Sequence, residues 1–277
     1  MDEPRTPMLA PPSYVSPAKR FEQFAGDPNF MASLARGLAV INAFQERKRH
    51  LTIAQISHRT EIPRAAVRRC LYTLMQLGYV TTDGRTYSLL PKVLTLGHAY
   101  LSSTPLAVSA QPALDRISER LHEACNLATL EGEQVLYLAR SAIPQRLISV
   151  DLSVGSRLPA YCTSMGRILL AALDDESLRD YLANAELLPK TSRTLHRPDE
   201  LWDCLQKVRQ QGWCLVDQEL EQGLRSIAVP VYDSTGHVLA AMNISTHASR
   251  VPASELEKRF LPILLSASQD LSAQLFR

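Results

Sequence analysis

The sequence predicts an α+β protein with a winged helix-turn-helix, then a linker helix, then a mixed α/β domain. Three helical stretches between residues 33 and 77 end in a short helix, a tight turn and a longer helix, which is the order of a helix-turn-helix. An Asp-Gly pair between two β-prone runs follows directly. Beyond residue 123, candidate antiparallel strands mix with helices, which is typical of an α+β domain.

The chain of 277 residues is long enough for two ordinary domains, and we expect four segments. Residues 1–28 contain six prolines and little apolar periodicity, which predicts a flexible arm. The winged helix-turn-helix is expected over 29–90 and the linker helix over 91–104. The second domain then occupies 105–277.

The first helix of the DNA-binding domain is expected to begin near Ser33. Leu34, Leu38, Ile41 and Phe44 recur at helical spacing and should face the core. A polar stretch, residues 45–50, ends this helix.

The second helix is expected to begin at Thr52, because Thr52 and Gln55 have the spacing of a capping box. It is short, since Ile62 precedes a proline and is restricted to extended geometry. Pro63 suits the first turn of a third helix, which we expect to run to Leu77. The inward positions of that third helix are Val67, Cys70, Leu71, Leu74 and Leu77.

The wing is expected as a hairpin formed by residues 79–82 and 85–89. Asp83-Gly84 would form its turn, because both positions of a tight hairpin turn need positive φ. A small α/β module without a DNA role is the alternative interpretation of these elements.

Past the wing, the pattern turns helical over 91–101 and again through Leu114, Ile117 and Leu121. The strands expected in the second domain are 124–130, 134–139, 147–150, 213–216, 224–232 and 238–245. The helices expected there are 164–173, 175–185, 198–211 and 253–275.

Charge separates the two parts of the chain although the net charge is only +2. Residues 29–92 hold ten Lys and Arg against three acidic residues, a net charge of +7. Residues 1–28 carry −1 and residues 93–277 carry −4. The basic block suggests a polyanion such as double-stranded DNA as partner of the first part, although an unevenly charged solvated surface gives the same count.

Several classes of protein do not fit the composition. Five cysteines without C-x-x-C spacing and seven scattered histidines predict neither a disulfide framework nor a metal site. We expect no cofactor and no catalytic residue. The N-terminus lacks a signal-peptide pattern and no apolar stretch approaches ~20 residues, so we expect a cytoplasmic protein without membrane contact.

The third helix is expected to read DNA, since the N-terminal half of a recognition helix meets base edges. Arginine bonds guanine bidentately and also pairs with phosphate. The wing tip and the N-terminus of the second helix are further phosphate sites. The candidate DNA-binding residues are Thr52, Arg64, Ala65, Arg68, Arg69, Tyr72 and Arg85.

Three separated motifs resemble the IclR family of bacterial transcription regulators. They are DPNFMASLARGL at 27–38, SVGSRLPAYCTSMGR at 153–167 and GLRSIAVPV at 223–231, and their order and spacing agree with that family. The sequence is most similar to the branch that controls protocatechuate and 4-hydroxybenzoate catabolism. The resemblance implies a GAF-like effector domain, dimers or tetramers on operator DNA, and a small aromatic or dicarboxylic acid as effector. RNA polymerase is a further candidate partner.

The resemblance also implies where the effector lies. Six effector positions are carried over from the family, and Tyr161 is added as a residue that could line the pocket. The expected effector residues are Tyr161, Ser164, Met165, Gly166, Ser226, Asn243 and Ser245. Free backbone N–H groups at Gly166, where an apolar helix opens, would suit a carboxylate. The arginines that could pair with a carboxylate are Arg140, Arg146, Arg157 and Arg167, among which the sequence does not choose.

The leading interpretation is therefore a regulator that binds an acid and, as a dimer, a pseudo-palindromic operator. The sequence leaves open whether it activates or represses, and whether the acid is 4-hydroxybenzoate, protocatechuate or β-ketoadipate. Two other functions also stay open. One is a constitutive architectural DNA binder, and the other is an enzyme with a DNA-binding attachment, which the lack of a G-x-S-x-G elbow or P-loop disfavours.

Overall fold

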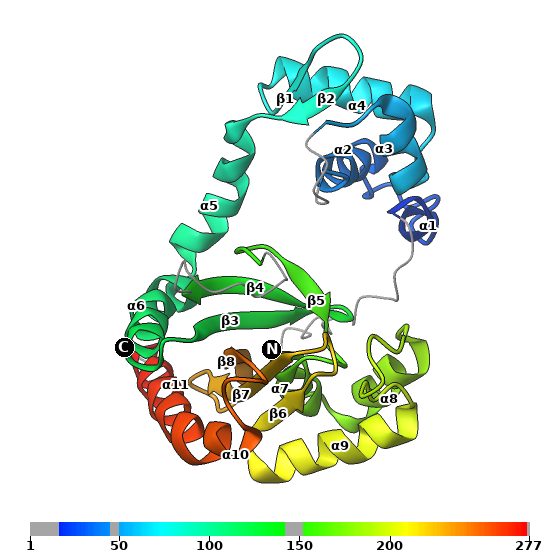
Figure 1. Ribbon diagram of the computed structural model, residues 1–277. Helices are drawn as coiled ribbons and strands as arrows, with labels where there is room; N and C mark the ends of the chain where they lie inside the picture. The colour runs from blue at the N-terminus through cyan, green and yellow to red at the C-terminus, as the bar shows by residue number, and fades with distance from the viewer. Residues whose placement is uncertain (1–16, 45–49, 142–151, 276–277) are drawn as a thin grey trace, which may run out of the picture. The chain divides into compact units, whose positions relative to one another are not determined.

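The computed structural model describes residues 17–44, 50–141 and 152–275 (Figure 1). These form two compact units, of which one ends at Ser103 and the other begins at Thr104. Each unit has its own buried core. None of the described helices is both long and apolar enough to cross a membrane.

The first unit is a winged helix-turn-helix, as predicted. Its elements are α1 (Pro17–Glu22), α2 (Ala32–Asn42), α3 (Ile53–Thr60), α4 (Arg64–Gln76), β1 (Val80–Thr82) and β2 (Tyr87–Leu89). The capping box is present at the start of α3: Gln55 N–H donates to Thr52 Oγ1, and Thr52 N–H donates to Gln55 Oε1 at 2.9 Å. Val67, Leu71 and Leu74 of α4 are buried, whereas Cys70 is half-buried and Leu77 is exposed, contrary to prediction.

The predicted face of α2 is correct only in part, because Ile41 and Phe44 pack against the core whereas Leu34 and Leu38 do not. The helix begins after Met31 with no side-chain cap, so Ser33 lies within it. Leu34 and Leu38 are 57% and 50% exposed, while Ala39 and Val40 are buried. Leu34 and Leu38 instead border a surface groove between α2 and α4.

Part of the expected flexible arm is ordered. Residues 17–22 form α1, and the Phe24 ring stacks on Phe30 with ring centroids 4.5 Å apart. The Phe21 ring lies 6.0 Å from Phe30. Contacts between aromatic rings thus stabilise this segment, although its proline-rich composition predicts a flexible arm.

The wing is a hairpin as expected, but its turn differs. Thr82 pairs with Tyr87, so the loop has four residues, 83–86, rather than two. Only Gly84 has positive φ. The Asp83 carboxylate accepts hydrogen bonds from the backbone N–H of Arg85 and Thr86 at 2.8 and 2.6 Å. These bonds hold the pKa of Asp83 low, at about 2.

After the wing, a 3₁₀ turn (Pro91–Val93) leads into α5 (Leu94–Ser103), where the linker helix is expected. The second unit opens with α6 (Pro105–Leu121) and contains a six-stranded antiparallel sheet of order β5-β4-β3-β8-β7-β6. The strands are β3 (Ala124–Glu131), β4 (Gln134–Ser141), β5 (Arg157–Pro159), β6 (Cys214–Asp217), β7 (Leu224–Tyr232) and β8 (Val238–His247). Sequence analysis missed β5, and the strand expected at 147–150 lies outside the described residues.

Helices cover both faces of this sheet (Figure 1). One face packs on α6, a π-helical turn (Leu256–Phe260) and α11 (Leu261–Leu275), and the short helix α10 (Ala253–Glu255) leads into that turn. The other packs on α7 (Ser164–Ala171), which is covered in turn by α9 (Pro198–Gln211) and, beside it, α8 (Asp175–Asn184). Helix α7 contacts β3, β7 and β8, so its N-terminus lies over the centre of the sheet.

Candidate nucleic-acid interface and ligand cavity

Helix α4 presents a basic surface. Its exposed side chains include Arg64, Ala65, Arg68, Arg69 and Tyr72, all of which are predicted DNA-binding residues. Residues three and four apart share one face of a helix, so 64, 68 and 72 form a row with 65 and 69 beside it. This face is separate from the buried one that carries Val67 and Leu71.

The arginines of this surface are available to a ligand. Within the described ranges, Arg64, Arg68 and Arg85 make no side-chain hydrogen bond or ion pair. Arg85 is exposed at the wing tip. Arg59 differs, because its Nη1 donates to Ala43 O at 2.8 Å and so braces the helices. Thr52 is half-buried, with its hydroxyl used in the capping box.

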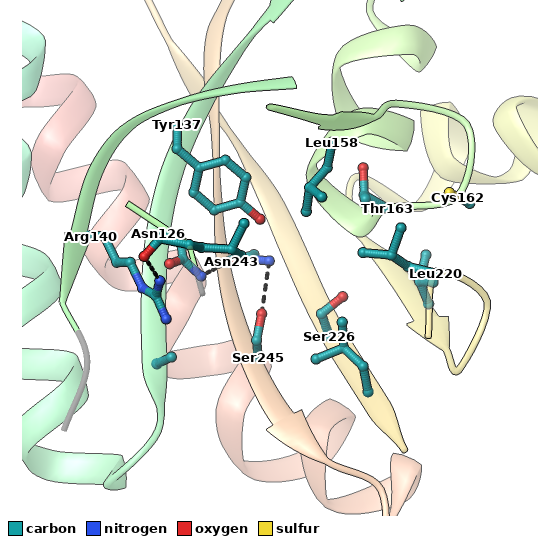
Figure 2. Close-up of a pocket in the computed structure, with 14 residues that line it drawn as sticks. Asn126, Tyr137, Arg140, Leu158, Cys162, Thr163, Leu220, Ser226, Asn243 and Ser245 are labelled. Atoms are coloured by element: carbon teal, nitrogen blue, oxygen red, sulfur yellow. Dashed lines mark hydrogen bonds between the residues drawn. The ribbon is translucent and has the colours of Figure 1, made fainter. Parts of the chain in front are cut away.

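A cavity lies in the second unit, on the sheet face that α7 covers (Figure 2). It is narrow, with a volume of about 30 Å³ accessible to the centre of a water-sized molecule, and it is partly open to solvent. Its floor comes from β3, β4, β7 and β8, and its walls come from β5, β6 and the loop residues that precede β5 or follow β5 and β6. The lining residues are Ala124, Asn126, Tyr137, Arg140, Leu152, Leu158, Cys162, Thr163, Val216, Leu220, Leu224, Ser226, Asn243 and Ser245.

Strand register brings the polar side chains of the floor together. Asn126 pairs across the strands with Arg140 on one side and with Asn243 on the other, which forms one row. Ser245 pairs with Ser226, which forms the next row. Paired residues point to the same face of a sheet, so the two rows share the cavity floor.

Hydrogen bonds connect these rows. Asn126 Nδ2 donates to Asn243 Oδ1 at 2.8 Å, and Asn243 Nδ2 donates to Ser245 Oγ at 3.2 Å. Ser164, at the start of α7, donates through its hydroxyl to Ser226 Oγ at 2.8 Å. The floor is therefore a connected polar network with mostly apolar walls, an arrangement that suits a small amphipathic molecule.

Two buried polar atoms at one end of the cavity have no hydrogen-bond partner among the described residues. Arg140 Nη1 donates to Leu152 O, but its Nε is buried without a partner, as is Asn126 Oδ1. The Tyr137 hydroxyl points into the cavity in Figure 2 and makes no hydrogen bond to another described residue. Burial raises the pKa of Tyr137, an effect that the nearby charge of Arg140 partly opposes.

The structure brings together four of the seven predicted effector residues. Ser226, Asn243 and Ser245 line the cavity, and Ser164 is hydrogen-bonded to this group. Tyr161 and Met165 do not line it: Met165 is fully buried in the core, and the Tyr161 hydroxyl donates to Leu188 O.

Gly166 also lies outside the cavity, and its amide is not free. Its N–H donates to Thr163 Oγ1 at 3.2 Å, because Thr163 is the N-cap of α7. A Cβ at this position would lie 2.1 Å from Ala160 O. Glycine is thus needed here for close packing of the helix against the preceding loop.

Two of the four arginines considered as carboxylate partners are engaged elsewhere. Arg167 is 2% exposed and forms a bidentate ion pair with Glu219 at 2.6 and 2.5 Å. Arg157 pairs with Glu131 at 2.6 Å on a partly exposed surface. Arg146 lies outside the described residues, whereas Arg140 lines the cavity.

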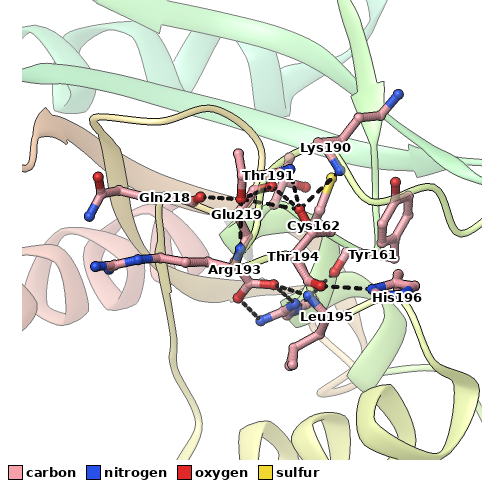
Figure 3. A network of polar contacts seen from close by, with 12 residues as sticks. Tyr161, Cys162, Lys190, Thr191, Arg193, Thr194, Leu195, His196, Gln218 and Glu219 are labelled. Carbon is pink, nitrogen blue, oxygen red and sulfur yellow. Dashed lines mark hydrogen bonds and ion pairs between the residues drawn. The ribbon is translucent and has the colours of Figure 1, made fainter.

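The Arg167–Glu219 ion pair connects the segments that form the cavity walls. Figure 3 shows Glu219 in contact with Thr194 and Leu195 of the loop before α9. Arg167 Nε donates to Tyr161 O, and Glu219 Oε2 accepts from Leu195 N–H, both at 2.8 Å. The loop that carries Glu219 also supplies Leu220 to the cavity. A buried ion pair gains little net stability, so its main effect here is to fix these loops relative to α7.

Sequence analysis missed several lining residues, above all Asn126 and Tyr137. Asn126 is an amide within the otherwise apolar stretch Ala124-Cys125-Asn126-Leu127-Ala128. A buried polar side chain in such a strand is a usable signal, since it requires a partner. The cross-strand position opposite Arg140 could not be read without the register.

Two family models match the chain. The one described as "IclR helix-turn-helix domain" matches residues 33–84, and "Bacterial transcriptional regulator IclR C-terminal" matches residues 98–273. The "Pca regulon regulatory protein" of Pseudomonas putida is 76% identical over 273 residues, which is 99% of this chain and 94% of that protein.

Solved structures of transcriptional regulators are also similar to this chain. A transcriptional regulator from Rhodococcus sp. RHA1 has a TM-score of 0.78 at 42% identity and covers 89% of this chain and 98% of its own. A double mutant of the PobR inducer-binding domain from Acinetobacter, in complex with 3-hydroxybenzoic acid, has a TM-score of 0.57 at 31% identity. It covers 61% of this chain and 98% of its own.

Proposed function

Since this chain belongs to the IclR family of bacterial transcriptional regulators, we propose that it regulates genes of aromatic-acid catabolism in response to an acid bound in the cavity. Operator DNA binds to α4 and the wing. The effector is an aromatic acid such as 4-hydroxybenzoate or protocatechuate, or a product of their degradation such as β-ketoadipate. The high identity to a Pca regulon regulator carries this proposal.

The DNA-binding part of the proposal is supported by the surface of α4. Arginines 64 and 68 are exposed in its N-terminal half and make no ion pair with any residue that the structure describes. Free guanidinium groups suit guanine edges and phosphates. Arg85 at the wing tip suits a phosphate or the minor groove.

The effector part is supported by the cavity floor. The Asn–Ser network on β3, β7 and β8 is polar, buried and connected, and it lies next to one arginine. The related PobR domain was solved with an aromatic acid bound. A bound acid shifts the equilibrium between a DNA-binding state and a non-binding state only as far as its affinities for the two states differ.

We propose a homodimer as the DNA-binding form, or a tetramer built from such dimers. Helix α5 contains no charged residue, and Leu94, Leu96 and Tyr100 are exposed on it. An isolated helix of ten residues is marginal in water, and an uncharged exposed surface of this kind marks a contact with another chain.

A ligand panel tests the proposal. Full-length protein is melted with 4-hydroxybenzoate, protocatechuate or β-ketoadipate, and each acid that raises the melting midpoint is titrated and added to an operator gel shift. We expect at least one acid both to stabilise the protein by mass action and to change its DNA affinity. Unchanged melting with all three acids, together with unaltered DNA binding, would favour a constitutive DNA binder.

A further inference from the structure

The described lining of the cavity carries a positive formal charge. Arg140 is the only side chain with a formal charge among its described lining residues, and no carboxylate faces it there. Burial raises the pKa of the Cys162 thiol to about 11, so this lining group is neutral near pH 7. An uncompensated guanidinium in a partly desolvated site favours an anionic ligand.

The guanidinium is also oriented. Its Nη1 donates a hydrogen bond to Leu152 O, which fixes one edge of the guanidinium plane. The opposite edge, formed by Nε and Nη2, makes no hydrogen bond to a described residue, and Nε is buried. Two parallel N–H groups on one guanidinium edge match the two oxygens of a carboxylate. The Asn126 oxygen without a partner lies at this same end, because Asn126 pairs with Arg140 across the strands. The Tyr137 hydroxyl points toward the middle of the cavity (Figure 2).

We infer that Arg140 anchors the effector's carboxylate through its Nε/Nη2 edge, with the Tyr137 hydroxyl as an additional donor. The Gly166 amide is not available for this role, because it already donates to Thr163 Oγ1. The Asn126–Asn243–Ser245 network then contacts the remaining polar groups of the effector. This inference rests on the proposed function only in assuming that the cavity binds an acid.

Isothermal titration with paired ligands tests the anchor. Each acid of the panel is compared with its neutral amide, for example 4-hydroxybenzoate with 4-hydroxybenzamide. Wild-type protein should prefer the acid by on the order of 10- to 100-fold, the range expected for hydrogen bonds to a charged group. Arg140→Met keeps the apolar stem and removes the charge, so the preference should fall to near unity.

Two further variants separate the effect of the positive charge from that of the hydrogen-bonding groups. Arg140→Lys keeps the charge without the planar edge and should give an intermediate preference. Tyr137→Phe removes one hydroxyl and should weaken acid binding several-fold while the charge preference persists. Thermal melting and operator binding without ligand establish that each variant is folded.

Arg157→Met is the matched control, because Arg157 pairs with Glu131 away from the cavity lining. It should bind acid and amide as the wild type does. If Arg140→Met retains the acid preference, or if Arg157→Met loses it equally, the anchor assignment is wrong while the proposed function stands. If the wild type binds none of the acids, the proposed function and the anchor both fail.

Discussion

At the scale of single residues, the recognition surface depends on which arginine reads a base. Arg68 lies in the second turn of α4, is exposed and makes no ion pair among the described residues. Its neighbours in the row, Arg64 and Tyr72, extend the contact along the helix. A guanidinium at this position reaches the major groove when the N-terminal half of the helix enters it.

We therefore expect Arg68→Ala to cost about 1–3 kcal/mol in operator affinity and to relax base preference at one position. Gel shifts on the operator and on single-base variants measure both effects. Arg116→Ala, an exposed arginine on α6 in the other unit, serves as control and should bind unchanged. A uniform loss across all sequences with a shallower salt dependence would instead assign Arg68 to a phosphate.

At the scale of elements, two helical glycines differ in the space that a side chain would have. A Cβ at Gly166 in α7 would meet the Ala160 backbone at 2.1 Å, whereas a Cβ at Gly37 in α2 would meet nothing within 4 Å. Gly166→Ala must therefore displace α7 from the loop that precedes it. Gly37→Ala only removes the backbone freedom of glycine in the unfolded chain.

Gly166→Ala should lower the free energy of unfolding by about 1–3 kcal/mol through overpacking. It should also weaken acid binding, because Ser164 moves with α7. Gly37→Ala is the matched substitution and should raise the free energy of unfolding by about 0.5–1 kcal/mol. Urea denaturation followed by circular dichroism measures both, and equal stability of the two variants would show that α7 has room to shift.

The elements also show what the sequence could and could not predict. Helix α4 and the capping box of α3 follow from local signals, namely Pro63, Thr52 with Gln55, and a regular apolar stripe. The buried face of α2 was mispredicted in part: Ile41 and Phe44 pack against the core, but Ala39 and Val40 are buried where hydrophobicity favours Leu34 and Leu38. The wing turn was mispredicted because Asp83 forms side-chain bonds that a dipeptide pattern does not encode.

The ligand cavity was predictable only in part, for a geometric reason. Ser226, Asn243 and Ser245 came from family resemblance, and the structure places them on the cavity floor. Asn126 and Arg140 oppose one another only through the register of β3 and β4. A one-residue slip would reverse every side chain of a strand, so contacts of this kind require the tertiary structure.

At the scale of the whole molecule, the two units have separate cores and separate candidate ligands. The core of the first unit lies among α2, α3, α4 and the wing, and those of the second lie on the two faces of the six-stranded sheet. The related solved structure is of the PobR inducer-binding domain, and this chain covers 98% of it. Independent folding of the second unit is therefore expected.

A fragment of residues 104–277 should fold and bind the best acid of the panel with a dissociation constant within about twofold of the full-length value, because every described cavity residue lies within it. Calorimetric titration measures the affinity, and Arg140→Met in the fragment is the matched negative control. In the full-length protein, operator DNA should stabilise the first unit and the acid the second, each by mass action. A fragment that melts cooperatively but no longer binds the acid would show that the cavity needs the DNA-binding unit to form.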